Sequence, residues 1–145
     1  MKTVFANHSE VCHIWAQQNQ ASGKASRIFF EGPSIYSYGR HFEIARFVKP
    51  GVVLFTTADY SVSTSKHKSE TRSAVSHLSV YTVPSLDARH DENLEYYIRE
   101  MGKWSVKASL AIKHGAIWLN QMERMRKEAR AYLVEFKKDI PASLR

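Results

Sequence analysis

The 145-residue sequence contains a single cysteine, Cys12, which excludes an intramolecular disulfide. A lone cysteine is typical of proteins from a reducing compartment, so we expect a cytoplasmic location. No run of about 18 or more apolar residues is present, and we expect no membrane-spanning helix and no membrane partner. The start of the chain, MKTVFANHSEV, lacks the apolar core of a secretory signal, so we also expect no export signal.

Common catalytic and metal-binding motifs are missing too. The sequence has no Walker glycine pattern and no GxSxG elbow, which argues against a triphosphate-binding loop and a serine nucleophile. Its seven histidines show no HExxH or HxH spacing. His8 and Cys12 could share a helix face, but a zinc site needs more ligands than these two. We therefore expect no metal site and no cofactor, and we interpret Cys12 as a small core residue.

Positive charge is what the sequence has in excess. The 21 Lys and Arg residues outnumber the 14 Asp and Glu residues, which gives a net charge of +7. Such a surplus favours polyanionic partners, above all nucleic acid. Residues 87–102 hold two basic and five acidic residues, whereas residues 103–130 hold seven basic and two acidic residues. Part of this polarity needs no partner, because it complements the dipole of a helix.

The first half of the chain predicts a helix followed by strands. Asn7 and Glu10 form a capping-box pattern ahead of an apolar stripe, which predicts a helix over residues 8–21. Short β-prone runs then alternate with the turn signals GP, GR and KPG. Strands joined by such short connections pair antiparallel. The segment DYSVSTSKHKSETR then leads into a short helix, and SVYTVP reads as a further strand.

The C-terminal third predicts helix, because apolar residues recur there at near-helical spacing. One helix over residues 92–138 would extend about 70 Å, which exceeds the dimensions of a domain of this size. We therefore expect a break near Gly102 or Gly115, and Asp91 is the predicted N-cap.

Together these elements predict an α+β fold in a single domain overall. It consists of an antiparallel sheet of about four to five strands packed with an N-terminal helix and a long C-terminal helical region. Residues 1–86 form the predicted α+β core, and residues 87–145 form the helical region, packed on the core or projecting from it.

The basic C-terminal helical face is the main predicted binding surface for nucleic acid or another partner. Lys103 and Lys107 have the spacing of one helix face, and so do Arg126 and Arg130, so these residues could follow a phosphate backbone. A solvated helix face is the alternative, and Met122 and Met125 could instead serve a protein interface. The predicted residues are Lys103, Lys107, Lys113, Arg124, Arg126, Lys127 and Arg130.

The stretch DYSVSTSKHKSETR predicts a second, anion-binding cluster. Ser65, Lys66 and His67 lie near a helix start, where free N–H groups attract phosphate. Arg40 and His41, in a neighbouring turn, could meet the same anion. The alternative is that the hydroxyls only cap the helix and that His67 is a core histidine. A paired-histidine ribonuclease that uses His41, His67 and Lys66 is a further interpretation of these residues.

Tyr36 and Tyr38 form a predicted aromatic contact, because they share a strand face next to cations. Aromatic rings beside cations can stack on bases and hold phosphates. The alternative is that the paired tyrosines stabilise the sheet through cross-strand contacts.

The strings IYSYGRHFEIARFV, VVLFTTADYSVSTSKHKSETRSA and EVCHIWAQQNQ resemble an uncharacterised family of small proteins encoded by tailed phages. The resemblance covers roughly residues 4–83 and includes a YSYGxHFxIARF motif. It brings no assigned activity, but it implies a phage product that acts in the cytoplasm of a bacterial host.

Three functional hypotheses follow. The leading one is a non-enzymatic protein that binds nucleic acid or a nucleoprotein complex through the basic C-terminal helical face. The second is an anti-defence, anti-CRISPR-like protein–protein inhibitor of a host immune complex. The third is the metal-independent nuclease. The sequence also allows a homodimer through the C-terminal helices.

Overall fold

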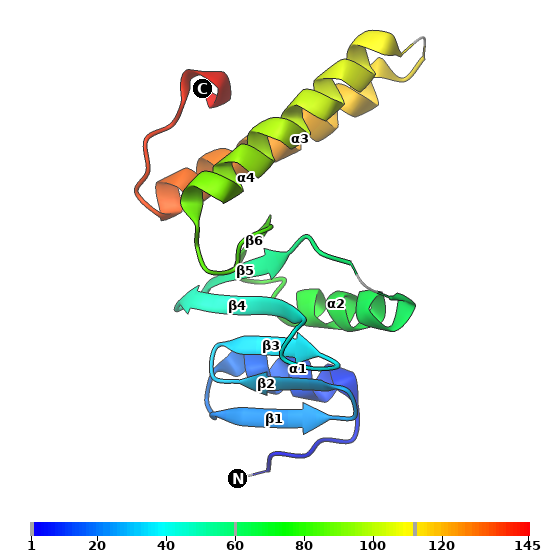
Figure 1. Ribbon diagram of the computed structural model, residues 1–145, viewed down its shortest axis with the longest axis vertical. Helices are drawn as coiled ribbons and strands as arrows, with labels where there is room; N and C mark the ends of the chain where they lie inside the picture. Colours follow the sequence, from blue (N-terminus) through cyan, green and yellow to red (C-terminus); the bar gives the residue numbers. More distant parts are fainter. Residues whose placement is uncertain (1, 60, 112) are drawn as a thin grey trace. The chain divides into compact units, whose positions relative to one another are not determined.

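The computed structural model describes residues 2–59, 61–111 and 113–145 (Figure 1). The chain divides into two compact units, Met1–Ala88 and Arg89–Arg145. The fold is α+β, as predicted, with an N-terminal helix, a six-stranded mixed sheet and two long C-terminal helices. None of the described helices combines the length and the apolar content that crossing a bilayer requires.

The first helix, α1 (His8–Gln17), begins at the predicted place because Asn7 caps it. The Asn7 side chain accepts a hydrogen bond of 2.8 Å from the Glu10 backbone N–H. The helix ends earlier than predicted, at Gln17, and the backbone of its C-cap, Gln18, turns left-handed with φ 52°. The Gln18 side chain holds this reversal by donating to the Trp15 carbonyl at 2.8 Å.

The sheet contains six strands in chain order, of which the first five form an antiparallel meander. The last strand pairs parallel with the strand before it. Helix α2 (Val62–Ala74) connects the two strands and returns the chain to the end of the sheet at which the fifth strand began, so the sixth strand runs in the same direction. The prediction did not include β1 or this parallel pair. The strands are β1 (Ser22–Ala25), β2 (Ile28–Glu31), β3 (Ser34–Ser37), β4 (Glu43–Lys49), β5 (Val52–Thr56) and β6 (Ser79–Val83).

The core of the first unit lies where α1 and α2 pack against each other and against the sheet. Trp15 is fully buried, with its ring centroid 4.9 Å from that of Phe47 and its Nε1 donating to the Pro33 carbonyl at 3.0 Å. The Cys12 thiol lies 3.5 Å from the Thr71 hydroxyl. Burial raises the pKa of this thiol to about 11, so Cys12 is an inert core residue.

The second unit is a helical hairpin of α3 (His90–Leu110) and α4 (Gly115–Glu135), followed by the short helix η1 (Ala142–Leu144). The chain reverses just before Gly115, one of the two predicted breaks, whereas Gly102 lies inside α3. The N-cap prediction was wrong: α3 begins one residue before Asp91, and its N-cap, Arg89, makes no side-chain capping bond. Asp91 lies in the first turn, where its charge favours the helix dipole.

A buried polar cluster joins the two helices near their open end. The Tyr132 hydroxyl accepts from Asn93 Nδ2 at 2.8 Å and hydrogen-bonds to His90 Nδ1 at 2.8 Å. The Tyr97 hydroxyl donates to Glu128 Oε2 at 2.6 Å. Burial is the main cause that raises the pKa of Tyr97 and of Tyr132. These hydrogen bonds pair polar groups that would be buried without a partner when α3 packs on α4, which would destabilise the hairpin.

Candidate nucleic-acid interface

One flank of α3 carries a regular row of cations. Arg99, Lys103 and Lys107 are four residues apart and exposed, so they lie one above the other on the same side of the helix. The Lys103 ammonium lies 2.9 Å from Glu100 Oε1. An exposed ion pair of this kind is weak, so a phosphate can compete for the lysine. The prediction missed Arg99, although its spacing from Lys103 marks it as part of the row.

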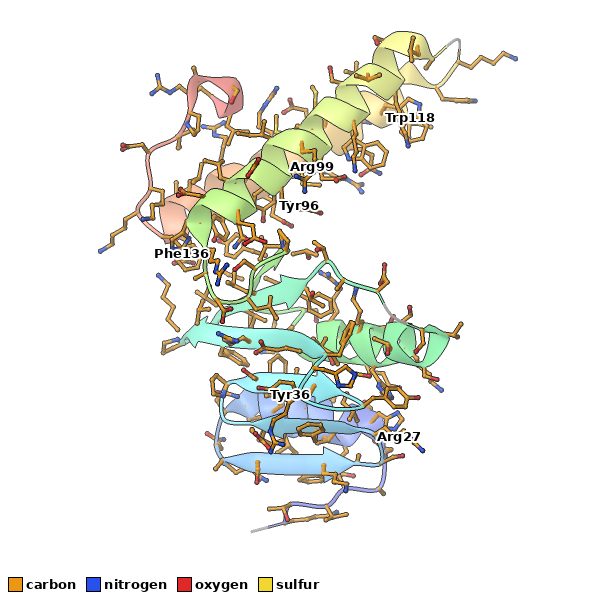
Figure 2. All side chains as sticks on the ribbon, viewed as in Figure 1. Arg27, Tyr36, Tyr96, Arg99, Trp118 and Phe136 are labelled. Atoms are coloured by element: carbon orange, nitrogen blue, oxygen red, sulfur yellow. The ribbon has the colours of Figure 1, made fainter. Side chains whose placement is uncertain are left out.

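We assign Arg124 of α4 to the same flank of the hairpin because of its spacing from Glu128. Glu128 lies one turn further along α4, on the side of Arg124, and acts electrostatically on Tyr96 of α3, as Arg99 does. Burial, Glu100 and Glu128 raise the pKa of Tyr96, whereas Arg99 lowers it. Tyr96, Arg99 and Trp118 can be followed along one flank in Figure 2. We call Arg99, Lys103, Lys107 and Arg124 the basic flank.

Two tryptophans lie beside this row. The rings of Trp104 and Trp118 are stacked, with centroids 5.5 Å apart and planes inclined by 12°. The Lys107 ammonium lies 4.8 Å from the Trp104 ring centroid and 5.1 Å from that of Trp118. Both indoles are half-buried, so the stack fixes the position of Lys107 and leaves part of its aromatic surface accessible. The sequence prediction did not include either tryptophan, although Trp104 and Lys107 have helical spacing.

Two of the other predicted basic residues, Arg126 and Arg130, do not share a side of α4 with Arg124 of the basic flank. Arg124 and Arg126 are two residues apart, which places them about 160° apart around α4. Arg126 is half-buried and pairs with Glu123, and its Nε has no hydrogen-bond partner among the described residues. Arg130 is exposed one turn beyond Arg126. Lys127 is also exposed, but it is three residues from Arg124 and therefore lies toward the side of Arg124. Lys113 is exposed in the connection that follows α3.

Near the chain reversal the hairpin exposes apolar side chains. Between 47% and 76% of the surface of each of Val106, Leu110, Ile117 and Leu119 is accessible. We call these four residues the apolar tip. Val106 and Leu110 are four residues apart and share one side of α3, so these two mark a surface that a partner could cover.

At the start of α2 the hydroxyls act as caps. Ser61 is the N-cap, and its side chain accepts from the Thr64 backbone N–H at 3.2 Å and donates to the Thr64 hydroxyl at 3.1 Å. The cap occupies one of the N–H groups that an anion would need. Ser65 and Lys66 are exposed in the first turns of the helix.

His67 is a core histidine rather than a surface group. Only 2% of its surface is exposed, and its Nδ1 hydrogen-bonds to the Ser37 hydroxyl at 2.7 Å. The His8 ring meets it edge-on at 4.6 Å between centroids. Burial lowers the pKa of His67, with smaller contributions from His8 and Lys66, while Glu70 opposes the shift. A buried, neutral imidazole is poorly placed to exchange protons with a substrate, which argues against the ribonuclease interpretation.

The remaining members of the anion cluster and the tyrosines lie near the end of β3. Arg40 forms an ion pair with Glu31, and His41 is exposed. Tyr36 stacks on Phe29 with ring centroids 5.1 Å apart. Tyr38 does not continue the strand: its backbone is left-handed, with φ 66°, and its ring lies 5.6 Å from that of His67.

In the described ranges, no group of three or more His, Cys, Asp and Glu side chains is placed to hold a metal ion. No protein-family model, no curated protein and no solved structure matches the chain.

Proposed function

We propose that the protein is a non-enzymatic nucleic-acid binder that contacts phosphates through the basic flank of its hairpin. The observation that carries the proposal is the row of Arg99, Lys103 and Lys107, exposed at every fourth position of α3. Successive cations of the row are about 6 Å apart along the helix axis. A fixed ladder of cations neutralises successive phosphates and releases their counterions, which favours binding.

The tryptophan stack supports this assignment. Lys107 is held over Trp104 and Trp118, so its ammonium is ordered before a ligand arrives. Ordering in advance lowers the entropic cost of binding. The partly accessible indoles add aromatic surface next to the cations, a combination that suits nucleic acid better than a small anion.

The resemblance to phage-encoded proteins supports a setting in the cytoplasm of a bacterial host. There the ligand would be free nucleic acid or a nucleoprotein complex, and both present a phosphate backbone to the basic flank.

Fluorescence anisotropy with labelled DNA and RNA tests the proposal. The triple variant Lys103→Gln/Lys107→Gln/Arg124→Gln should weaken binding about tenfold or more, because it removes contacts to phosphate. The matched control, Lys66→Gln/Arg130→Gln/Lys137→Gln, removes as much charge at exposed positions outside the basic flank. Equal weakening by the two variants would show that only net charge matters, and the basic flank would lose its assignment.

The apolar tip favours a second candidate function, an anti-defence inhibitor that binds a host protein complex. Val106 and Leu110 share one face of α3, and both are exposed. Apolar contact of this kind drives protein association rather than phosphate binding. Pulldown from nuclease-treated host lysate distinguishes the two: a protein partner would be retained by the wild type and lost with Leu110→Asp. A partner that disappears with nuclease treatment would favour nucleic acid instead.

A further inference from the structure

The first unit carries a cross-strand row of side chains on the sheet face opposite Phe30 and Ile35. In the register of the sheet Lys24 lies opposite Phe29, and Phe29 lies opposite Tyr36. Side chains directly opposite each other project from the same face. Lys24, Phe29 and Tyr36 therefore form one line across β1, β2 and β3, about 10 Å long.

The two aromatic rings of this row are stacked. Their centroids are 5.1 Å apart and their planes are inclined by 21°. Tyr36 covers one side of the Phe29 ring, and Phe29 also lines a cavity of about 520 Å³ that Tyr36 does not line. An aromatic ligand in this cavity would extend the Phe29–Tyr36 stack by one ring.

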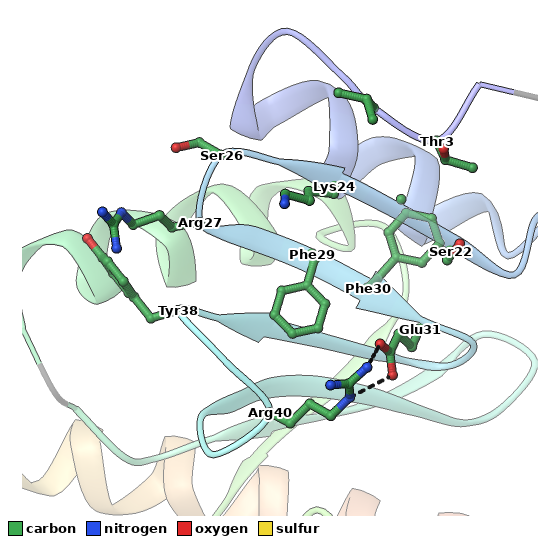
Figure 3. Close-up of a pocket in the computed structure, with 12 residues that line it drawn as sticks. Thr3, Ser22, Lys24, Ser26, Arg27, Phe29, Phe30, Glu31, Tyr38 and Arg40 are labelled. Atoms are coloured by element: carbon green, nitrogen blue, oxygen red, sulfur yellow. Dashed lines mark hydrogen bonds and ion pairs between the residues drawn. The ribbon is translucent and has the colours of Figure 1, made fainter.

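Cations surround the same cavity (Figure 3). Lys24, Arg27 and Arg40 line it, together with one carboxylate, Glu31. Arg40 pairs with Glu31, and its Cζ lies 5.9 Å from the Phe29 ring centroid. Among the described residues no carboxylate pairs with Lys24 or Arg27, so both charges are available to a ligand.

The position of Arg27 is already ordered. Its Cζ lies 5.3 Å from the Tyr38 ring centroid, and Tyr38 also lines the cavity. The cavity thus presents an aromatic surface to one part of a ligand and fixed positive charge to another. This division matches a nucleobase joined to a phosphate.

We infer that this cavity binds an unpaired base of single-stranded nucleic acid, RNA or DNA. The base stacks on Phe29, and Lys24 and Arg27 hold the adjoining phosphates. A duplex does not fit, because its bases already cover each other's faces. The inference does not depend on the basic flank: the cavity belongs to the first unit and would bind a single strand even if the hairpin did not.

A variant series on the full chain tests the assignment. Anisotropy is measured with a labelled, unstructured oligonucleotide of about 10 nucleotides, as RNA and as DNA, and with a duplex of the same length. Phe29→Leu keeps apolar bulk but removes the aromatic face, and should weaken single-strand binding about fivefold or more. Phe29→Tyr keeps the stacking ring and should bind like the wild type. Neither substitution should change duplex binding.

The charges of the cavity are tested separately. Lys24→Gln/Arg27→Gln alters exposed residues only, so folding is preserved, and it should weaken single-strand binding to a similar extent. Lys49→Gln/Lys66→Gln is the matched control, exposed in the same unit but outside the cavity. Unchanged affinity in Phe29→Leu and in Lys24→Gln/Arg27→Gln would overturn the inference. So would AMP bound as tightly as the oligonucleotide.

Crosslinking locates the bound oligonucleotide on the chain directly. A 4-thiouridine oligonucleotide is crosslinked to the wild type, and trypsin then releases residues 28–40, which contain Phe29 and Tyr36. A crosslink in this peptide that persists when the basic flank is neutralised is the expected result. Crosslinks confined to hairpin peptides would overturn the inference and leave the proposed function intact, and absence of single-strand binding would overturn it as well.

Discussion

Trp104 of α3 stacks on Trp118 of α4, with ring centroids 5.5 Å apart and planes inclined by 12°. The pair ties the two helices together toward the end where the chain reverses. Lys107 lies over both rings, so a residue of the basic flank is also part of this tie. The packing of the hairpin and the position of its proposed phosphate contact are therefore coupled.

Trp104→Leu should destabilise the hairpin. The substitution keeps an apolar side chain but removes the ring stack and the cation–π contact, which together contribute about 1–2 kcal/mol to the free energy of unfolding. Urea unfolding followed by far-UV circular dichroism measures the loss. Leu119→Ala, an exposed position on α4, is the control and should change stability by no more than about 0.5 kcal/mol. A Trp104→Leu hairpin as stable as the control would show that the stack contributes nothing.

The C-terminal helices were predictable because their apolar residues keep helical spacing over a long stretch of sequence. The position at which this helical region breaks was harder to predict. Gly102 and Gly115 are equivalent as sequence signals, yet only Gly115 stands at the reversal. A glycine inside a helix costs only about 1 kcal/mol, which the burial of the neighbouring Met101 offsets. Single-residue propensity is too weak to overrule such packing.

The sheet was predicted in type but not in full. Strand β1 is short and polar, and it exists because it pairs with β2 and because Gly23 allows close approach of Phe30. The parallel pairing of β6 depends on where α2 returns the chain. Neither cause is local, so neither leaves a pattern in the sequence.

The candidate site shows the same limit. Composition indicated a basic C-terminal region, but helix rotation places Arg124 and Arg126 on different sides of α4. The two arginines also differ in their charge partners, because Arg126 forms an ion pair with Glu123. The Phe29–Tyr36 stack depends on strand register, which sequence pattern alone did not define.

His67 should make the stability of the first unit depend on pH. Burial, His8 and Lys66 lower its folded pKa, and Glu70 opposes them. The unfolded chain binds a proton below about pH 6.5, whereas the folded chain stays neutral to lower pH. The contribution is therefore fully present above pH ~6.5 and falls as the pH drops, by at most about 1.4 kcal/mol per pH unit.

The measurement is urea unfolding between pH 7.5 and pH 5, with the variant His67→Gln beside the wild type. The glutamine can still hydrogen-bond to Ser37 but does not titrate, so its stability should fall less steeply. The comparison also removes the effect of His90 in the hairpin, whose pKa burial lowers in the same direction. Parallel curves for the wild type and His67→Gln would contradict the prediction.

Alanine at two glycines should have opposite effects. At Gly102 an added Cβ would meet no atom within 4 Å from the described residues beyond its own turn of helix, so Gly102→Ala should stabilise the hairpin by about 0.5–1 kcal/mol through helix propensity. At Gly23 an added Cβ would lie 2.6 Å from Phe30 Cε1 and 2.9 Å from Phe5 Cε2. Gly23→Ala should therefore destabilise the first unit by about 1–3 kcal/mol. Thermal unfolding of both variants measures the signs, and a stabilised Gly23→Ala would show that the two rings can yield.

The salt dependence of binding should count the phosphates that the basic flank contacts. The logarithm of the association constant falls linearly with the logarithm of salt concentration, with a slope of about −0.7 for each phosphate on a single strand and −0.9 on a duplex. Removal of Lys103, Lys107 and Arg124 should therefore reduce the steepness by about 2 to 3, whereas Phe29→Leu should lower affinity and leave the slope unchanged, because stacking releases no counterions. Titrations at several salt concentrations separate the two contributions. If Phe29→Leu reduced the slope as much as the charge variant does, both surfaces would act as one electrostatic site. That result would contradict the assignment of phosphate contacts to the basic flank and of base stacking to Phe29.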